Sequence, residues 1–485
     1  MGYKRFISVI FLFLLGLHLF AQDKKNSYPS LEPEYVFPFS AVFELTGREI
    51  IQISLEFSSC HEDTAGYNDC LEVYDKLEDT VTGSEYKKMD VRQRAEAVLD
   101  LMYSEVLTDY DEKQTRMDVL FQSGKYNCVS SSVLYMALCR AAGISVCGNM
   151  TPCHAFCTVS TDGSDVDVEC TNPLGFDIGS KKIKDESKYY IIPASKYNGR
   201  KKVSDRMFVS LVANNLISLF NKEGDYDKAV PYAASRMVFL KDSPQEEYED
   251  ARSIFDTVAG NLSASYQKKS AYVDALLWMD MVYRRWGMTP LLQEKYDEAF
   301  SNAVIYVCNG GDIDTALSLY NAYKKNVSRT NATSCEYLIT HKSLEIAFRD
   351  LDNMGCIEYL EKNYDKNLIS NKDIIAAIDQ YYEYYWYKVI DSYIKSNSST
   401  QESSSMYSDA ISLCCRALKD VPSSESINSF KDQILYNYSV YIHNNVARLY
   451  NEGQKEEALS VLEEGITFYP DSKVLQNDKA FLSNQ

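Results

Sequence analysis

The spacing of apolar residues divides the chain into a mixed first part and a helical second part. Over residues 90–204, helical spacing is followed by two segments in which apolar and polar residues alternate. From residue 205 onwards the alternating segments disappear, and helical spacing with short polar breaks takes over. We therefore predict an α+β domain over 90–204 and an all-α region over 205–485. A length of 485 residues is too great for one hydrophobic core, which agrees with this division.

The N-terminal segment has the pattern of a targeting sequence. Residues 1–21 begin with the basic residues Lys4 and Arg5, continue with an apolar run over 6–20 and end on Ala21. This is the layout of a secretory signal peptide, which directs a protein to export. The apolar run is short for a membrane span. We therefore expect an exported protein, periplasmic or extracellular, with no integral membrane span beyond the signal segment.

Residues 22–89 form a mixed N-terminal region. Within it, IQISLEFS over residues 51–58 alternates between apolar and polar positions, which favours a strand, although helical spacing just beyond it leaves a helix open. Asp90 is a good N-cap residue, and the segment after it places apolar residues on one helical face. These residues are Val91, Ala95, Val98, Leu99 and Met102. We therefore predict that a helix after Asp90 opens the α+β domain.

A second predicted helix carries the first candidate for chemistry. In GKYNCVSSSVLYMALCRAAGI, residues 124–144, a polar turn is followed by an almost continuously apolar helix that ends at Gly143. Cys128 stands at the start of this helix, and both a helix N-terminus and a neighbouring histidine favour the reactive thiolate. Cys139 lies in the last turn among apolar residues and is expected in the core. Cys128 is therefore the candidate nucleophile, with a buried structural thiol or a disulfide as the alternatives.

Two alternating segments are predicted to form a β-hairpin. The first is TPCHAFCTV, residues 151–159, and the second is DVDVECT, residues 165–171. The Asp-Gly pair at 162–163 is a strong signal for a two-residue hairpin loop. With that loop, residue 161 pairs with 164, and residue 154 pairs with 171. A slip of one residue would move every side chain to the other face, so the loop decides which residues meet.

The hairpin register brings a histidine and a carboxylate together. His154 and Glu169 lie on the same face as diagonal neighbours, at a separation of roughly 7 Å that their side chains can bridge. A histidine that acts as a base needs such a group to orient its ring. Asp167 lies on the same face and is the fallback acid. A core histidine without a chemical role is the alternative for His154.

Together these residues resemble the transglutaminase-like superfamily, whose members share the papain-like arrangement of Cys, His and Asp. The resemblance rests on NCVSSSVLYMALCRAAGI, then CHAFCTV and then VECTNP, and it covers about residues 90–180. It implies that Cys128 is the nucleophile, His154 the general base and acid, and Glu169 the acid that orients His154. The sequence departs from the family pattern at Glu169, where Asp is usual, and at Phe156, where Trp is frequent.

Two further roles concern the oxyanion and a metal. Gln122 lies six residues before Cys128, the offset of the oxyanion-hole Gln in papain-like proteases, so the resemblance implies that it acts with the Cys128 backbone N–H. The family chemistry needs no organic cofactor, and we predict none.

A zinc site is the alternative for the cysteines around His154. The strand pattern turns His154 away from Cys153 and Cys157, so we predict no metal site.

Composition narrows the function classes. The chain has 69 acidic and 50 basic residues and a net charge of −19, which argues against a nucleic-acid-binding surface.

Export permits disulfides, and Cys60 with Cys70, or Cys414 with a neighbour, are candidate pairs. The total of 13 cysteines is odd, so at least one thiol stays free or pairs between chains.

The helical half contains a repeated sequence signal. GDYDKA at 224–229, GDIDTA at 311–316 and GQKEEA at 453–458 each place a Gly five residues before an Ala. The pattern resembles tetratricopeptide repeats, in which Gly forms the turn between paired helices and small residues let the helices approach. Two copies match further, at Ala410, Cys414, Ala417 and Pro422, and at Ala458, Leu462, Gly465 and Pro470. We therefore expect a tetratricopeptide-like helical solenoid that binds a protein partner.

Two biased segments interrupt this helical half. The Tyr-rich stretch QYYEYYWYKVI, residues 380–390, is interpreted as packing between helices, with a ligand-binding stripe as the alternative. The Ser-rich stretch over 396–405 is interpreted as a flexible excursion between two helices. Neither segment changes the predicted fold class.

These features predict an exported cysteine hydrolase or acyltransferase of the transglutaminase-like type, acting on amide bonds of a protein or peptide substrate. The acyl group would pass through a thioester on Cys128, which water hydrolyses or an amine cross-links. The alternative is a catalytically inactive transglutaminase-like domain that serves, with the repeats, as a protein-interaction scaffold.

Overall fold

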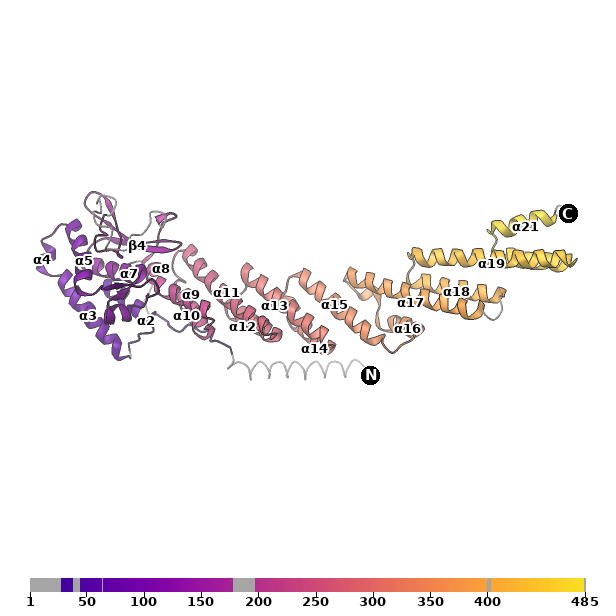
Figure 1. Ribbon diagram of the computed structural model, residues 1–485, viewed down its shortest axis with the longest axis horizontal. Coiled ribbons are helices and arrows are strands. Elements are labelled where there is room, and N and C mark those ends of the chain that lie inside the picture. Colours follow the sequence, from indigo (N-terminus) through magenta and orange to yellow (C-terminus); the bar gives the residue numbers. More distant parts are fainter. Residues whose placement is uncertain (1–27, 38–43, 63, 178–196, 399–402, 484–485) are drawn as a thin grey trace. The chain divides into compact units, whose positions relative to one another are not determined.

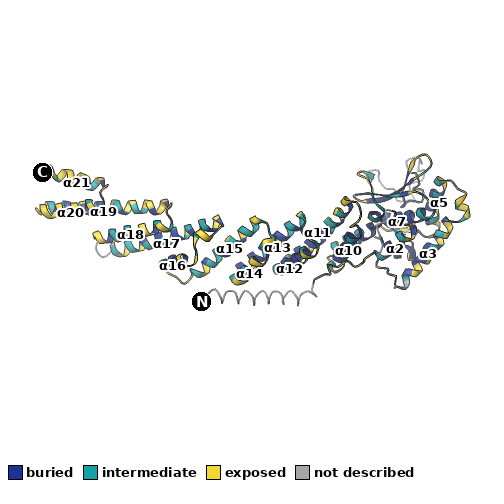
Figure 2. Ribbon diagram, turned by 180° about the vertical axis from the view of Figure 1, so that it is seen from behind, coloured by how far each residue is buried: buried dark blue, intermediate teal, exposed yellow. Residues whose placement is uncertain are grey.

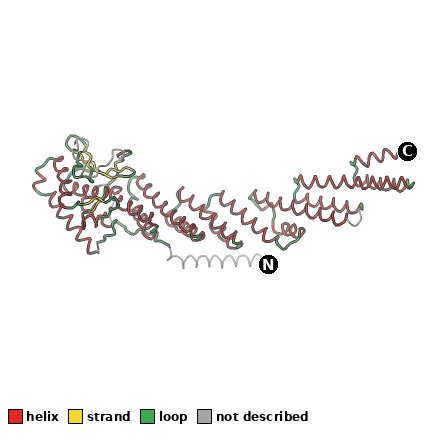
Figure 3. The backbone as a smooth tube through the Cα atoms, in the orientation of Figure 1, coloured by secondary structure: helices red, strands yellow, loops and turns green. Residues whose placement is uncertain are grey.

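The structure is a computed structural model (Figure 1) that describes residues 28–37, 44–62, 64–177, 197–398 and 403–483. The predicted signal peptide, residues 1–21, lies outside the described residues. The chain divides into two compact units, residues 1–303 and 304–485. The protein is mostly helical, with a small antiparallel sheet in its N-terminal part followed by many packed helices (Figure 3).

The first unit combines a sheet with the helices that surround it. Its first elements are α2 (Gly47–Glu56), α3 (Ala65–Val81), α4 (Ser84–Lys87), α5 (Val91–Glu105), β1 (Asp109–Tyr110), α6 (Met117–Ser123), β2 (Lys125–Tyr126) and α7 (Cys128–Ala141). The strands β3 (Val146–Thr151), β4 (His154–Ser160), β5 (Asp165–Val168) and β6 (Lys201–Lys202) follow. The unit continues with the helices α8 (Asp205–Val209), α9 (Leu211–Glu223), α10 (Tyr226–Phe239), α11 (Gln245–Lys268) and α12 (Tyr272–Trp286).

The described part of the second unit is helical. Helix α13 (Pro290–Asn309) runs across the division between the units. It is followed by α14 (Ile313–Tyr323), α15 (Arg329–Ala347), α16 (Asn353–Asn363), α17 (Lys372–Ser398), α18 (Ser404–Asp420), α19 (Glu425–Asn451), α20 (Lys455–Phe468) and α21 (Lys473–Ser483). Two short 3₁₀-helices, Lys324–Asn326 and Lys366–Leu368, lie between them. The predicted change to an all-helical chain after residue 204 is confirmed for the described residues.

Helix α7 is the central element of the α+β part. Its residues 133–139 are 0% exposed, and Figure 2 shows the helix in the colour of buried residues. Helices α2, α3 and α5 and strands β3 and β4 all contact it. Helix α2 approaches closely because Gly47 has no side chain: a Cβ there would lie 2.3 Å from the carbonyl oxygen of Ala137. The region over 22–89 therefore contributes core helices to this part of the molecule.

The segment over residues 51–58 lies mainly in helix α2, so the strand favoured there is wrong. Thr46 and Glu49 form a capping box that starts the helix. The apolar residues of the segment are 0% exposed: Ile51, Ile53, Leu55 and Phe57. A helix that is buried on most of its surface needs no polar stripe, so its apolar residues can also fall into an alternating pattern.

The two helices predicted around the candidate nucleophile are confirmed. Helix α5 begins directly after Asp90, whose carboxylate accepts the N–H of Gln93 in a capping box. Four of its five predicted core residues are buried: Ala95, Val98, Leu99 and Met102. Helix α7 begins at Cys128 and ends at Ala141, and Gly143 follows with a left-handed φ of +70°. Gly accepts this conformation at low cost, so the helix ends where the sequence predicts.

The predicted hairpin register is confirmed. The sheet has the order β5-β4-β3-β6, and all its neighbouring strands are antiparallel. Strands β4 and β5 pair from Ser160–Asp165 to Cys157–Val168. The N–H of Thr161 donates to the carbonyl oxygen of Ser164 at 3.1 Å and closes the loop over 162–163. This is the pairing that a two-residue Asp-Gly loop predicts.

The repeated glycines form the turns that the repeat pattern predicts. Gly224 follows α9, Gly311 follows α13 and Gly453 follows α19, each with a left-handed φ of +76° to +82°. The alanines five residues later, Ala229, Ala316 and Ala458, are each 0% exposed. Small buried residues on the second helix of a pair allow close packing. A Cβ added at Gly465 of α20 would lie 2.8 Å from Ile442 of α19.

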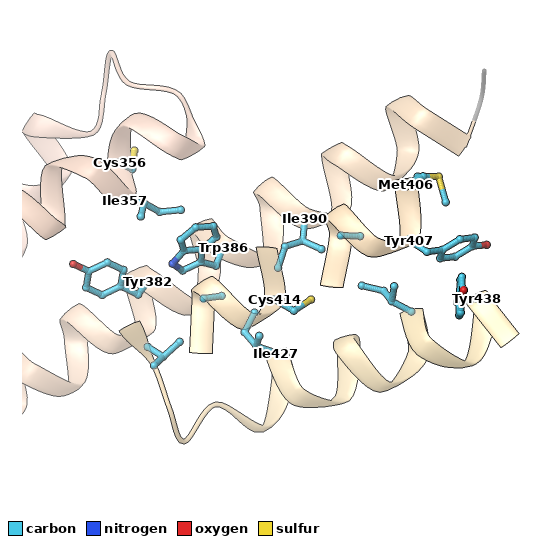
Figure 4. Close-up of a cluster of buried hydrophobic side chains, with 14 of the residues drawn as sticks. Cys356, Ile357, Tyr382, Trp386, Ile390, Met406, Tyr407, Cys414, Ile427 and Tyr438 are labelled. Atoms are coloured by element: carbon cyan, nitrogen blue, oxygen red, sulfur yellow. The ribbon is translucent and has the colours of Figure 1, made fainter. Parts of the chain in front are cut away.

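The second unit has its own hydrophobic core, and the Tyr-rich stretch contributes to it. Figure 4 shows Tyr382, Trp386 and Ile390 of α17 among apolar side chains of neighbouring helices. Trp386 is 0% exposed and its indole N–H donates to a carboxylate oxygen of Asp420 at 2.7 Å. Tyr384 is 55% exposed, so only part of the stretch is packing. Residues 396–398 of the Ser-rich stretch belong to α17, 403–405 lie at the start of α18, and 399–402 lie outside the described residues.

Candidate active site

Cys128 is the first residue of the buried helix α7. Asn127 caps this helix: its Oδ1 accepts the N–H groups of Val129 and Ser130, each at 3.0 Å. Ser130 Oγ accepts the N–H of Asn127 at 3.0 Å, which completes a capping box. Cys128 is partly exposed, and its own N–H takes no part in this cap. The sulfur therefore lies at the positive end of a helix dipole, as the sequence predicts.

His154 and Glu169 form a buried hydrogen-bonded pair. His154 is the first residue of β4, and its Nε2 lies 2.7 Å from Oε2 of Glu169. The two residues are 5% and 3% exposed. Glu169 comes directly after the last residue of β5, where the strand pairing has ended. The structure thus brings together the two residues that the hairpin register makes diagonal neighbours.

Further donors hold the Glu169 carboxylate in place. The hydroxyl and N–H of Thr171 donate to Oε1 at 2.6 and 3.2 Å, and the hydroxyl of Tyr197 donates to Oε2 at 2.5 Å. The Tyr197 ring also packs edge-on against His154 and Phe156, with centroid distances of 5.7 and 5.1 Å. Sequence reasoning missed Tyr197, because no periodic pattern connects it with a residue 28 positions earlier.

The pair is ionised at neutral pH. Burial by itself lowers the pKa of His154, but hydrogen bonds to Cys128 and Glu169 and the charge of Glu169 raise it to about 10. Burial by itself raises the pKa of Glu169, but its contacts with His154, Thr171 and Tyr197 lower it overall. Nε2 of His154 contacts Glu169, so Nδ1 is its other ring nitrogen. Cys128 and His154 line the same cavity, which places the three candidate residues in one region of the molecule.

The structure does not bring the fallback acid, Asp167, to His154. Asp167 pairs with Thr158 on β4 and accepts its hydroxyl at 2.6 Å. It also forms an ion pair with Arg200 Nη1 at 2.6 Å, and its side chain is 47% exposed. Asp167 shares the strand face that was predicted for it, but it lies beside Thr158, two side chains along that face from His154. The position of the acid at the site is occupied by Glu169.

The structure also does not bring Gln122 to Cys128. Gln122 is an exposed residue in the last turn of α6, and its side-chain amide nitrogen lies 3.3 Å from where a Cβ of Gly66 in α3 would be. Gly124 then adopts a left-handed φ of +72°, and β2 separates α6 from α7. The offset of six residues therefore does not produce the papain-like position here. At the N-terminal turn of α7, the N–H of Cys128 takes no part in the helix cap.

Cys128 and His154 open into a cavity of about 510 Å³. One part of its lining comes from the α+β elements, including Tyr110 and Met150. Another part comes from the helices α9, α10 and α11, including Asn214, Arg236 and Asp250. The volume lies in the range of sites that enclose small molecules or a few atoms of a larger chain. The cavity therefore joins the candidate triad to the first helices after the sheet.

Most of the remaining cysteines are buried, whereas Cys128 is partly exposed. All thirteen are free thiols, so the candidate disulfide between Cys60 and Cys70 is not formed. Burial raises the pKa of Cys70 to about 12 and that of Cys414 to about 11, and it raises the pKa of Cys139 still further. Cys139 is fully buried, which confirms its predicted place in the core. Buried thiols of this kind are protonated and unreactive at neutral pH.

The cysteines around His154 were the alternative candidates for metal ligands. Among the described residues, no group of three or more His, Cys, Asp or Glu side chains is placed to hold a metal ion. Cys157 instead packs on α7 and donates to the carbonyl oxygen of Ser132 at 3.3 Å.

No described helix is both long enough and apolar enough to cross a membrane.

Comparison with known proteins does not identify a family. No family model and no curated protein matches the chain. Among solved structures, the chain is similar to the crystal structure of menin, which is described as revealing the binding site for the Mixed Lineage Leukemia (MLL) protein. The similarity covers 81% of this chain and 93% of the menin chain, at 12% sequence identity and a TM-score of 0.32. A likeness this distant carries no argument about function.

Proposed function

We propose that this protein is an exported, transglutaminase-like cysteine hydrolase or acyltransferase that acts on amide bonds. The observation that carries the proposal is that Cys128 and His154 line one cavity and that His154 is hydrogen-bonded to Glu169 behind it. A thiol at a helix N-terminus beside a cationic imidazole has the environment that favours a nucleophilic thiolate. A carboxylate on the far side of the ring fixes its orientation, which is the general logic of a nucleophile, base and orienting acid.

The reaction that fits this arrangement is acyl transfer in two steps. The Cys128 thiolate attacks the carbonyl carbon of the amide, and the carbonyl oxygen takes the electron pair. His154 then gives its proton to the leaving nitrogen, the C–N bond breaks, and a thioester on Cys128 remains. Water or an amine attacks this thioester, His154 takes up a proton from the attacking group, and the S–C bond breaks to restore the thiolate. Water gives hydrolysis and an amine gives a new amide.

The first turn of α7 supports stabilisation of the oxyanion. The side chain of Asn127 already satisfies the N–H groups of Val129 and Ser130, whereas the N–H of Cys128 is outside that cap. A backbone N–H at a helix N-terminus, next to the attacking sulfur, is the usual type of oxyanion donor. The proposal therefore needs no contribution from Gln122.

The helices of the second unit support a binding role. Tetratricopeptide-like pairs stack through their small buried residues and leave their outer side chains for a partner. In this chain, Tyr337 and Tyr384 are 38% and 55% exposed and line a cavity of about 470 Å³ on α15 and α17. We propose that this half binds a protein or peptide partner and that the first unit carries the chemistry.

The test is alkylation of the full-length chain by iodoacetamide at pH 7, with the rate at each cysteine followed by mass spectrometry. Cys153 and Cys415 are exposed thiols and serve as internal references. We expect Cys128, although only partly exposed, to react at least about tenfold faster than either reference, because a helix N-terminus and a neighbouring histidine make a cysteine more reactive. Equal or slower labelling of Cys128 would overturn the proposal.

Two histidine variants complete this test. His154→Ala removes the imidazole beside Cys128 and is expected to abolish the excess reactivity. His61→Ala is the matched control, because His61 also contacts a carboxylate, Glu56 at 2.8 Å, but lies away from the cavity. The excess reactivity is expected to remain in the control.

A second candidate function is a catalytically inactive scaffold. The observation that favours it is the position of Gln122, because a side-chain oxyanion donor expected for the active form is not at the site. An inactive domain would keep the fold, and its Cys128 would label no faster than Cys153. The same alkylation experiment therefore separates the two functions.

A further inference from the structure

Two buried polar atoms on the helical wall of the cavity lack hydrogen-bond partners. Arg236 Nη1 and Asn214 Oδ1 are both buried and have no partner among the described residues. Both residues line the cavity that contains Cys128 and His154. A buried donor or acceptor without a partner is costly, and native proteins rarely retain one without a reason. Finding one of each at the wall of the candidate active site calls for an explanation.

Arg236 is firmly held, so its free N–H has a fixed direction. The residue is 1% exposed and lies on α10. Its Nε donates to Ser210 Oγ at 3.3 Å, and its Nη2 donates to Asp250 Oδ2 at 2.9 Å. Because Asp250 already balances the positive charge, the remaining Nη1 donor suits a neutral carbonyl oxygen better than a second carboxylate.

Asn214 offers the complementary group. It lies on α9, which packs against α10, the helix that carries Arg236. The Oδ1 of Asn214 can only accept a hydrogen bond. Its neighbour Asn215 also lines the cavity, but the side chain of Asn215 donates to Thr115 Oγ1 at 3.3 Å. The pattern is therefore specific: one asparagine is engaged in the fold, and the other is left with a free acceptor.

We infer that Asn214 and Arg236 form a subsite for one peptide amide of the acyl substrate, separate from the amide that is cleaved. A secondary amide presents one C=O acceptor and one N–H donor, which satisfies both unpaired atoms at once. A simple carboxylate satisfies only Arg236, and an ester lacks the N–H that Asn214 requires. The inference rests on the proposed function, and it makes the first helical pair after the sheet a determinant of substrate specificity.

The experiment compares two alkylating probes on the full-length chain. One is the N-acetyl-alanyl-alanine chloromethyl ketone, and the other is its depsipeptide analogue, in which the central amide is an ester. In each case the Cys128 thiolate forms an S–C bond and displaces chloride. We expect the amide probe to label Cys128 about five- to 150-fold faster, because the ester leaves a buried acceptor unpaired.

Variants assign the two contacts of the amide to the two residues. Asn214→Leu is expected to reduce the amide-to-ester ratio towards one, whereas Asn214→Asp retains an acceptor oxygen and retains part of the ratio. Arg236→Met removes the donor to the carbonyl oxygen, which both probes carry, so it is expected to slow labelling by both probes. Asn215→Leu is the matched control for Asn214, and Arg252→Met is the control for Arg236, because Arg252 is ion-paired with Asp256 and does not line the cavity. Asn215→Leu is expected to keep the wild-type ratio, and Arg252→Met is expected to keep the wild-type labelling rates.

The outcomes distinguish this inference from the proposed function. If iodoacetamide labels Cys128 selectively but the amide-to-ester ratio is near one in the wild type, the subsite is refuted and the nucleophile stands. The same conclusion follows if the ratio is high but unchanged in Asn214→Leu, or if Arg236→Met labels with both probes as fast as the wild type, since the two side chains would then not bind the amide. If Cys128 shows no selective labelling by iodoacetamide, the proposed function fails first.

Discussion

Replacing Glu169 with Gln tests whether the charge of the His154–Glu169 pair stabilises the first unit. The substitution keeps the size and an acceptor oxygen but removes the negative charge beside a cationic ring. The wild-type pair is buried on both sides, with side-chain exposures of 1% and 3%. Breaking one side of such a pair leaves the other charge uncompensated, so His154 must lose its proton or stay charged at a cost.

The size of the effect follows from the pKa of His154. It rises from 6.5 to about 10 on folding, and at about 1.4 kcal/mol per pH unit this corresponds to about 5 kcal/mol at most. Cys128 accounts for part of the rise in the His154 pKa, and a Gln at position 169 still accepts a hydrogen bond. We therefore expect Glu169→Gln to lower the free energy of unfolding by about 2–4 kcal/mol at pH 6.

The pKa shifts of His154 and Glu169 determine how the stability of the first unit changes with pH. A raised His154 pKa gives stability that is complete below pH 6.5 and is lost as the pH rises through about 10. The lowered Glu169 pKa gives stability that is present above pH 4.5 and is lost as the pH falls through the lowered value. The difference between wild type and Glu169→Gln should therefore be largest near pH 6 and smaller, by roughly two-fifths, at pH 8.

The assay follows the buried thiol of Cys157, which lies on β4 and is 0% exposed. The protein is pulsed briefly with maleimide at increasing urea concentrations, and labelling of Cys157 is read by mass spectrometry. This reports the unfolding of β4 in the first unit, whether or not the second unit has unfolded. Asp167→Asn is the control, because this half-exposed carboxylate is expected to contribute about 1 kcal/mol or less. A Glu169→Gln difference that is equal at pH 6 and pH 8 would refute the reasoning and assign the role of Glu169 to packing.

Three further substitutions test the packing. Gly148→Ala places a Cβ 2.2 Å from the ring of Phe208, and we expect urea unfolding of the first unit to show a loss of at least about 1–3 kcal/mol; an unchanged midpoint would contradict the contact of β3 with α8. Gly465→Ala meets Ile442 at 2.8 Å, and faster hydrogen exchange confined to α19 and α20 is expected. Cys139→Ser replaces a fully buried thiol by a more polar hydroxyl, so a loss of about 1–3 kcal/mol is expected in thermal unfolding; a neutral result would show that Tyr135, which interacts with Cys139, satisfies the hydroxyl.

The hairpin was predictable because its information is local. The Asp-Gly loop and the alternation on both sides of it determine the register, and the register determines that His154 and Glu169 share a face. The start and end of α7 were predictable for the same reason, from the polar turn before Cys128 and the glycine at Gly143. Signals of this type depend on neighbours within a few residues, and tertiary packing did not override them.

The misplaced residues depended on contacts that are distant in sequence. The segment over 51–58 alternates like a strand, but it is buried against α7 as a helix, so both periods fit its apolar residues. Gln122 has the right offset from Cys128, but its side chain lies against Gly66 of α3. Tyr197 completes the Glu169 environment from outside the predicted hairpin. Only the helix over 51–58 has a local signal, the Thr46 and Glu49 capping box before it; the positions of Gln122 and Tyr197 have none.

The sequence by itself determined which residues stand at helix starts, strand faces and helix turns, because caps, alternation and glycine conformations act over a few residues. It therefore identified Cys128, His154 and Glu169 as candidates. Only the tertiary structure decided that the three converge, that Asp167 and Gln122 do not join them, and that α9 to α11 complete the cavity with Asn214 and Arg236. These decisions depend on burial and on side chains brought together across long separations, which no local pattern encodes.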